Sequence, residues 1–187
     1  MVHFFIGTKA QFIKMAPVMA EMQKRGLPFR LIDSGQHAEL SASVRSVFGL
    51  PEPAIALSDE KSEVIRVGGA IKWYLKILRR ARRDSAWLKN EVFPGGGICV
   101  IHGDTLSTLL GLQLAKRAKM KVAHVESGLT SRRRFEPFPE QLIRMFVMKR
   151  ADVLFAPGEQ AAWNLTRMRV RGKIVDTGRN KIGRAHV

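Results

Sequence analysis

The sequence has a single cysteine, Cys99, which lies inside an apolar run. One cysteine cannot build an intrachain disulfide framework, and it argues against a metal site made of cysteine thiolates. No apolar run is long enough to cross a bilayer as a helix. The first residues, MVHFFIGT, lack the charged segment and the long apolar segment of a secretory signal peptide. These absences predict a soluble protein of the reducing cytoplasm.

Acidic residues are also scarce. The 187 residues include 16 Asp and Glu against 32 Lys and Arg, which gives a formal net charge of +16 at pH 7. This balance predicts an anionic partner, and nucleic acid, acidic lipid or a phosphorylated substrate would each satisfy it. The sequence contains no internal repeat, no low-complexity linker and no GxxxxGK phosphate loop. Charge alone therefore leaves the class of partner open.

Apolar residues, by contrast, are plentiful and come in short runs. A hydrophobic content of 45% supports a packed core, either in one large domain or in one half of a two-domain enzyme. Apolar runs typical of buried strands alternate with segments of helical spacing, which predicts an α/β fold with a doubly wound, mostly parallel sheet. The predicted strands are 2–7, 28–35, 98–104, 121–127, 151–157 and 173–178, with a loop over 49–60. The predicted helices are 10–26, 40–48, most of 61–93, 105–119, 140–150 and 159–168.

Two of the predicted strands end in acidic residues. ICVIHGDT places Asp104 after one apolar run, and VAHVESG places Glu126 after the next. Ligands of open α/β sheets bind outside the carboxyl ends of the strands, and neighbouring strands lie about 4.8 Å apart. Two carboxylates so placed would shift each other's pKa, so that one could act as acid and the other as base. Alternatively, Asp104 caps the following helix; Glu126 precedes a glycine and fits that alternative less well.

Seven segments occur in the order found in one enzyme family: GTKAQFIKMAP, SGQHAEL, HGDT, HVESGL, PFPEQLIR, FAPGEQAAWNL and VDTGRN. From Phe4 to about Asn180 the chain therefore resembles the non-hydrolysing UDP-N-acetylglucosamine 2-epimerases. The resemblance implies a GT-B architecture, in which two Rossmann-like domains hold a nucleotide sugar between them without a cofactor or a metal. It also implies that residues 1–181 are only the amino-terminal domain, and that the complete enzyme is a homodimer.

Members of this family interconvert UDP-GlcNAc and UDP-ManNAc and so supply precursors for surface polysaccharides. The proton at C2 is removed as UDP leaves, and UDP then adds back with protonation from the opposite face. Such chemistry needs acids and bases on both sides of the sugar. The catalytic residues that the resemblance implies are Asp104, Glu126 and Glu140. The substrate-binding residues that it implies are Lys9, Lys14, Gln36, His37, His102 and Arg144.

The sequence departs from the family pattern at two positions near its start. Lys9 stands where an arginine is expected, and Gln11 stands where an acid is usual. Without the family, His102 and His124 are typical packing histidines, and Glu140 is an ordinary first-turn acid of a helix. Two other functions therefore stay open: the acceptor-side domain of a GT-B glycosyltransferase, and a hydrolysing UDP-GlcNAc 2-epimerase. For each of these functions we expect the 187-residue chain to be inactive alone, because half of the cleft is missing.

The segment IKWYLKILRRARRDSAWLK predicts a strongly basic helix over 71–89. Its apolar stripe is expected to be Ile71, Leu75 and Leu78, and its cations lie from Lys72 to Arg83. A solvated face of a domain helix would explain the charge, and contact with an anionic membrane is the sharper hypothesis. Nucleic acid is a third option, but no nucleic-acid-binding motif accompanies the charge.

The last six residues, Ile182 to Val187, read IGRAHV and leave the family pattern. A common short-read sequencing adapter encodes this hexapeptide in one reading frame. We therefore expect 182–187 to be a non-native tail on an artificially cut half of an enzyme.

Overall fold

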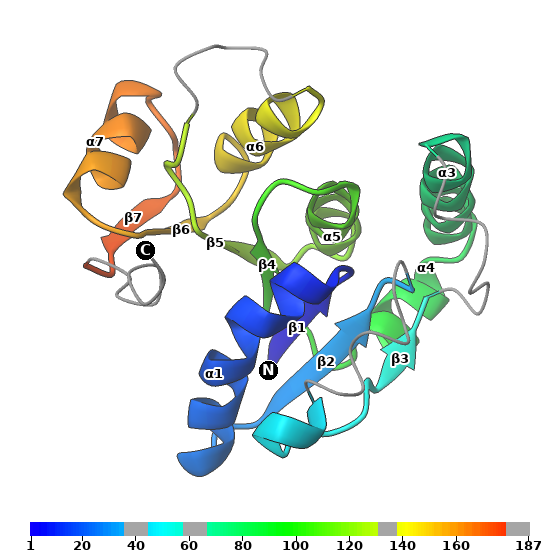
Figure 1. Ribbon diagram of the computed structural model, residues 1–187. Helices are drawn as coiled ribbons and strands as arrows, with labels where there is room; N and C mark the ends of the chain where they lie inside the picture. Colours follow the sequence, from blue (N-terminus) through cyan, green and yellow to red (C-terminus); the bar gives the residue numbers. More distant parts are fainter. Residues whose placement is uncertain (36–44, 58–66, 131–137, 179–187) are drawn as a thin grey trace.

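The computed structural model describes residues 1–35, 45–57, 67–130 and 138–178 of the chain. Within these ranges seven strands form one parallel sheet, in the order β3-β2-β1-β4-β5-β6-β7 (Figure 1). The chain runs outward from β1 in both directions, as in Rossmann-like folds, so the predicted doubly wound α/β architecture is confirmed. The strands are β1 (Val2–Ile6), β2 (Phe29–Asp33), β3 (Ile55–Ala56), β4 (Ile98–His102), β5 (Lys121–Val125), β6 (Val153–Ala156) and β7 (Lys173–Asp176).

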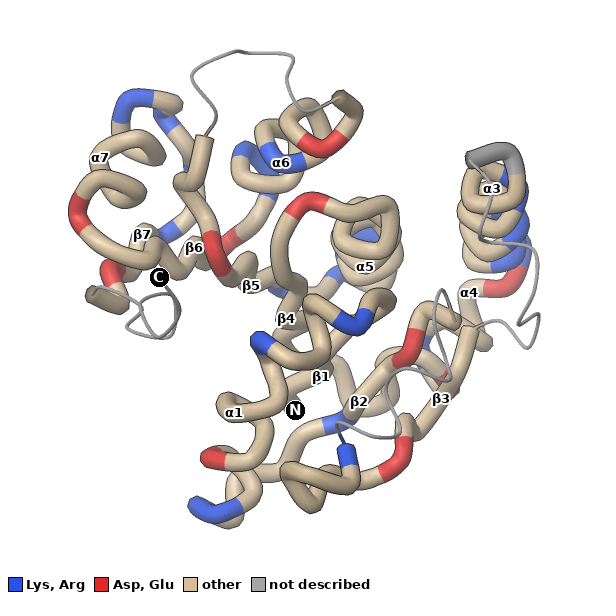
Figure 2. Tube along the Cα trace, viewed as in Figure 1, with Lys and Arg blue, Asp and Glu red and all other residues tan. Residues whose placement is uncertain are grey.

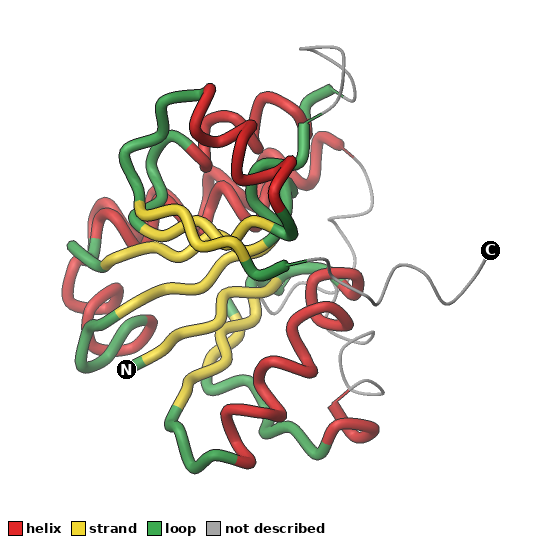
Figure 3. The backbone as a smooth tube through the Cα atoms, turned by 90° about the vertical axis from the view of Figure 1, so that its left-hand side faces the viewer, coloured by secondary structure: helices red, strands yellow, loops and turns green. Residues whose placement is uncertain are grey.

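Helices lie on both sides of the sheet (Figure 3). One face carries α1 (Lys9–Lys24), and the other carries the remaining long helices. No helix in the described part of the chain is long and apolar enough to cross a membrane. Besides α1 the helices are α3 (Val67–Arg83), α4 (Ser85–Trp87), the π-helical turn η1 (Leu88–Val92), α5 (Leu106–Arg117), α6 (Glu140–Met148) and α7 (Glu159–Arg167).

The core has one part on each face of the sheet. Phe4 and Phe5 are both 1% exposed although they are neighbours in β1. Successive strand side chains point to opposite faces, so Phe4 packs against α1 and Phe5 packs beneath the helices of the other face. A strand buried on both sides is typical of a parallel sheet, which explains the nearly continuous apolar run at the start of the sequence.

The face that carries α1 is covered unevenly. The helices that follow β4, β5 and β6 all pack on the opposite face. Val100, Val125 and Phe155, on the α1 side of these strands, are therefore only partly buried. They line a groove of about 630 Å³ alongside α1, which extends to His102 and Glu126 at the carboxyl edge of the sheet.

One local feature differs from the sequence-based expectation. The predicted loop over 49–60 contains β3, a strand of two residues that pairs with Ile32 and Asp33 of β2. So short a strand leaves no periodic pattern to recognise. Pro17 lies inside α1, where its ring removes one helical hydrogen bond, and the helix nevertheless continues to Lys24.

The buried side of α3 is also different from the predicted one. Ile71 is 49% exposed and Leu75 is 38% exposed, whereas Trp73 and Ile77 are buried at 5% and 4%. The indole Nε1–H of Trp73 donates to the carbonyl oxygen of Ser34, just beyond the end of β2, at 3.1 Å. The buried side of α3 is therefore the side of Trp73 and Ile77, and the predicted stripe is wrong for Ile71 and Leu75.

Candidate active site

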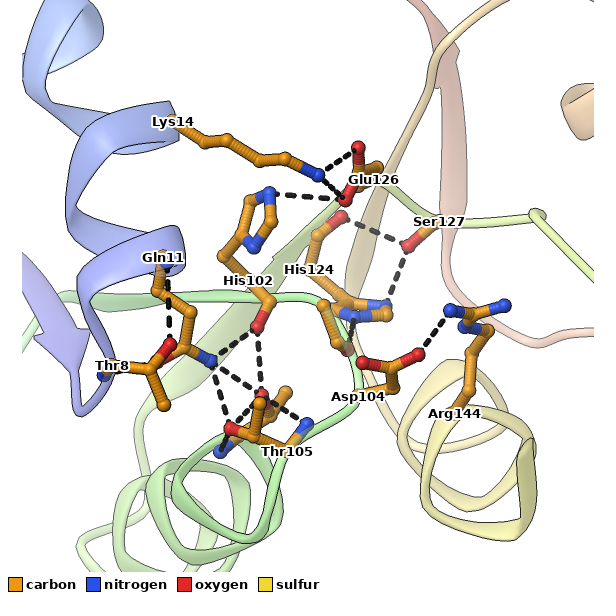
Figure 4. A network of polar contacts seen from close by, with 12 residues as sticks. Thr8, Gln11, Lys14, His102, Asp104, Thr105, His124, Glu126, Ser127 and Arg144 are labelled. Carbon is orange, nitrogen blue, oxygen red and sulfur yellow. Dashed lines mark hydrogen bonds and ion pairs between the residues drawn. The ribbon is translucent and has the colours of Figure 1, made fainter. Parts of the chain in front are cut away.

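The predicted acids lie at one edge of the sheet. β4 and β5 pair in register, with His102 opposite Val125. Asp104 and Glu126 come directly after these two strand ends, at the carboxyl edge where ligands of such sheets bind. The start of α1 reaches the same edge, because it follows β1, the other neighbour of β4. Figure 4 shows side chains from α1, β4, β5 and α6 meeting in one polar network.

The turn from β1 into α1 is fixed by a capping box. Thr8 is the N-cap residue: its Oγ1 accepts the N–H of Gln11 at 3.3 Å. The side-chain Oε1 of Gln11 in turn accepts the N–H groups of Gly7 and Thr8, at 2.9 Å and 3.2 Å. A Cβ on Gly7 would come within 2.0 Å of the Ser107 hydroxyl, so only glycine allows this close approach of β1 to α5.

The amide of Gln11 also joins α1 to the turn after β4. Its Nε2 lies 2.7 Å from the carbonyl oxygen of His102. The hydroxyls of Thr105 and Thr108 lie 3.0 Å and 2.9 Å from the same nitrogen. Gln11 is only 2% exposed, so these bonds form away from water. The residue that stands where the family usually has an acid therefore acts as a buried clamp.

Asp104 is an ion-pair partner and not a helix cap. The N-cap of α5 is Thr105, whose Oγ1 accepts the N–H of Thr108 at 3.3 Å. The carboxylate of Asp104 instead pairs with the guanidinium of Arg144 in α6. The second terminal nitrogen of Arg144 donates to the carbonyl oxygen of Leu129 at 2.9 Å. The planar fork of one arginine thus connects the β4–α5 turn to the segment after β5.

Glu126 is the second paired carboxylate. Its two oxygens accept hydrogen bonds from the ammonium group of Lys14 at 2.7 Å and 2.8 Å. One of them also lies 3.2 Å from Nε2 of His102. The backbone of Glu126 has φ +63°, a left-handed conformation that costs a residue with a side chain about 1 kcal/mol or more. The strand therefore ends in a strained residue that aims a carboxylate at two nitrogen groups.

His102 stands between the clamp and the second carboxylate. Its carbonyl oxygen accepts from Gln11, and its ring faces Glu126. The ring is 6% exposed, and burial lowers its pKa, although the neighbouring Glu126 charge acts in the opposite direction. Among the described residues the ring Nδ1 has no hydrogen-bond partner. His102 is therefore a neutral donor from Nε2 to the carboxylate, with one ring nitrogen unused.

His124 is fully buried and has a defined tautomer. Its Nε2 lies 2.7 Å from the carbonyl oxygen of Gly103, which can only accept, so Nε2 carries the proton. Nδ1, 2.7 Å from the hydroxyl of Ser127, is then the acceptor. Burial is the main cause that lowers the pKa of His124 to about 4. A neutral His124 thus holds the turn that carries Asp104.

The remaining predicted residues are less engaged. Glu140 is the first residue of α6, one turn before Arg144, and its buried Oε2 has no partner among the described residues. Lys9 is exposed at the first position of α1 and forms no ion pair with the described residues. Gln36 and His37 lie outside the described residues, as does the tail 182–187.

Sequence reasoning did not assign a role to several residues of this network. Gln11 and Thr8 could have been found, because Thr-x-x-Gln before a helical apolar pattern is a capping-box signature. Ser127 gave no comparable signal, since its function depends on a bond to the ring of His124.

The arrangement has the components of proton transfer beside an anionic ligand. Each strand-end carboxylate, Asp104 or Glu126, is held next to a cation, and a carboxylate is one of the groups that can take up or give a proton in catalysis. The side chain of Lys14 is 50% exposed, and it lines the groove together with His102 and Glu126. The described residues contain no group of three or more His, Cys, Asp and Glu that could hold a metal ion.

Comparison with known proteins places the chain in a family. The sequence model described as UDP-N-acetylglucosamine 2-epimerase matches residues 20–186. The UDP-N-acetylglucosamine 2-epimerase of Bacillus subtilis is 31% identical over 165 residues, which are 85% of this chain and 39% of that protein. The Campylobacter jejuni protein of the same name is 28% identical over 179 residues, 95% of this chain and 41% of its own length.

Solved structures agree with the sequence comparison. The crystal structure of UDP-GlcNAc 2-epimerase from Neisseria meningitidis bound to UDP-GlcNAc matches with a TM-score of 0.76 at 27% identity. The match covers 95% of this chain and 46% of that one. The chain thus spans less than half the length of these relatives. On the evidence of its sequence and its fold, the chain belongs to the UDP-N-acetylglucosamine 2-epimerase family.

Proposed function

We propose that residues 1–181 supply the amino-terminal domain of an enzyme that interconverts UDP-GlcNAc and UDP-ManNAc. One observation carries the proposal: Asp104 and Glu126 follow adjacent strand ends, and each is held beside a cation. Relatives matched over this region include an enzyme crystallised with UDP-GlcNAc. The relatives are more than twice as long as the match, which supports a second domain that closes the other side of the cleft.

Inversion at C2 of the sugar is an elimination followed by an addition. A carboxylate takes the C2 proton while the bond between C1 and the UDP oxygen breaks, which leaves a C1–C2 double bond and free UDP. The UDP oxygen then adds back to C1, and an acid returns a proton to the opposite face of C2. No electrons are gained or lost overall, so the cycle needs no oxidant or reductant. It needs two groups that transfer protons and cations that stabilise the charge of the leaving diphosphate.

The network supplies candidates for each of these roles. Asp104 and Glu126 are the proton-transfer groups, with Glu140 as a third carboxyl at the same edge. A bound diphosphate competes with Glu126 for the exposed ammonium group of Lys14. When Lys14 pairs with the diphosphate, His102 is the remaining partner of Glu126. Lys9 adds a second cation at the amino terminus of α1, where the helix dipole also favours phosphate.

The test is proton exchange at C2. A longer protein that contains this domain is incubated with UDP-GlcNAc in heavy water, and the recovered nucleotide sugars are analysed by NMR. We expect deuterium at C2 of both epimers, loss of exchange in Asp104→Asn and in Glu126→Gln, and no exchange with the 187-residue chain alone. Glu21→Gln is the matched control, because it removes an exposed carboxylate at the far end of α1.

Other products would assign a different function. Sugar transferred to an acceptor without deuterium at C2 supports a glycosyltransferase. Free ManNAc with UDP supports a hydrolysing epimerase. Full deuterium exchange in both Asp104→Asn and Glu126→Gln would show that neither carboxylate transfers the C2 proton.

A further inference from the structure

The outer face of α3 is a cationic surface that the proposed reaction does not use. α3 lies at the periphery of the molecule, beside α5 and away from the network of Figure 4 (Figure 1). Its lysines and arginines follow the side that faces away from the rest of the protein (Figure 2). From Lys72 to Arg83 the helix contains six cations and no acid.

Two aliphatic side chains lie among these cations. Ile71 and Leu75 are one helical turn apart and therefore lie above one another on the same face. They are 49% and 38% exposed, so they form a small apolar area inside the cationic face. Arg79 lies one helical turn beyond Leu75 on the same face, and Lys72 lies beside this face. Both cations are exposed.

The helix that carries this face is firmly anchored. Arg117 of α5 donates to the carbonyl oxygens of Ala81 and Arg82 at 2.7 Å and 3.1 Å, which satisfies groups at the carboxyl end of α3. The guanidinium of Arg80 lies 4.2 Å from the centre of the Trp87 ring. The helix that presents the outer face is therefore already folded and fixed to the protein, so its backbone need not be ordered on binding.

We propose that the outer face of α3 docks on anionic lipid, with Ile71 and Leu75 entering the headgroup layer while Lys72, Arg79 and Arg82 contact the phosphates. An exposed aliphatic pair inside a cationic field is complementary to a surface that is anionic outside and apolar beneath. The proposal is independent of the reaction at the carboxyl edge of the sheet.

Two other partners fit these residues less well. Single-stranded nucleic acid is bound by stacking on aromatic rings, but Trp73 is buried and its indole nitrogen is bonded to Ser34. A second copy of the chain carries the same net charge of +16, so two α3 faces would repel each other.

Vesicle sedimentation tests the proposal with the 187-residue chain. Vesicles of phosphatidylcholine are compared with vesicles of equal parts phosphatidylcholine and phosphatidylglycerol, at low and at high salt. Binding is expected only to the mixed vesicles and is expected to weaken at high salt. Each cation near such a surface contributes about fivefold in affinity, so Arg79→Glu/Arg82→Glu lowers binding by more than about 25-fold.

Two further variants separate docking from general charge attraction. Arg171→Glu/Lys173→Glu makes the same change in net charge at two exposed positions, one before β7 and one at its first residue, and it is expected to keep most of the binding. Ile71→Gln/Leu75→Gln changes no charge and is expected to lose about tenfold or more. Circular dichroism and a thermal melt establish that each variant is folded.

Three results would overturn the proposal. One is equal binding to neutral and anionic vesicles. Another is an equal loss of vesicle binding in Arg79→Glu/Arg82→Glu and in Arg171→Glu/Lys173→Glu, because net charge alone would then explain the binding. The third is an α3-dependent affinity for a single-stranded RNA homopolymer without vesicle binding, which would assign the surface to nucleic acid.

Discussion

His124 gives the candidate site a measurable dependence on pH. Burial lowers the pKa of His124 from 6.5 to about 4, so between these values the unfolded chain binds a proton that the folded chain does not. The unfolding free energy therefore falls as the pH falls. At about 1.4 kcal/mol per pH unit, the loss across the whole interval is about 3 kcal/mol, and between pH 7 and pH 5 it is about 2 kcal/mol.

The variant His124→Gln isolates this contribution. A glutamine amide can still donate to the carbonyl oxygen of Gly103, but it does not titrate. Urea unfolding of both proteins at pH 7 and pH 5 gives four free energies. Burial also lowers the pKa of His3, but His3 is present in both proteins, so its effect cancels in the double difference.

We expect the parent to lose about 2 kcal/mol more than His124→Gln when the pH falls from 7 to 5. Equal losses in the two proteins would refute the reasoning, because His124 would then titrate alike in the folded and unfolded states. A parent that gains stability on acidification relative to the variant would show a charged His124 in the fold, which contradicts the assigned tautomer.

Three further changes test other parts of the structure. Gln11→Leu removes the buried clamp and leaves unpaired N–H and carbonyl groups, so urea unfolding should show a loss of about 2 kcal/mol or more; an unchanged midpoint would contradict the clamp. Gly128→Ala places a Cβ 2.2 Å from the carbonyl oxygen of Ala161 and should lower stability by more than Gly26→Ala, which has similar φ but open space and should cost about 1 kcal/mol. In the longer protein, Glu126→Gln should reduce deuterium incorporation at C2 by at least about a hundredfold, and a smaller effect would exclude it as a proton-transfer group.

The strand ends are the part of the candidate site that the sequence predicts well. Runs buried on both faces of a parallel sheet must be apolar, so the points where they stop, near His102 and Val125, are visible in the sequence. A parallel sheet brings such points to one edge, which is why Asp104 and Glu126 could be placed there without coordinates.

The partners of those acids could not be predicted, because they come from distant segments. Arg144 reaches Asp104 only because α6 packs against α5, and sequence spacing does not fix that packing. Thr105 takes the helix cap that Asp104 could have filled, a choice between adjacent residues that both suit the position. The outward face of α3 likewise follows from the burial of Trp73 and Ile77 against distant segments.

The groove beside α1 has a consequence for biosynthesis. Ribosomes synthesise a chain from its amino terminus at about 5–20 residues per second. A proposed second domain as long as this chain would therefore take about 10 to 40 s more to emerge. During that interval Val100, Val125 and Phe155 would face water. Under the proposed two-domain arrangement, a nascent protein that contains this domain would leave the groove open to water until the second domain is made.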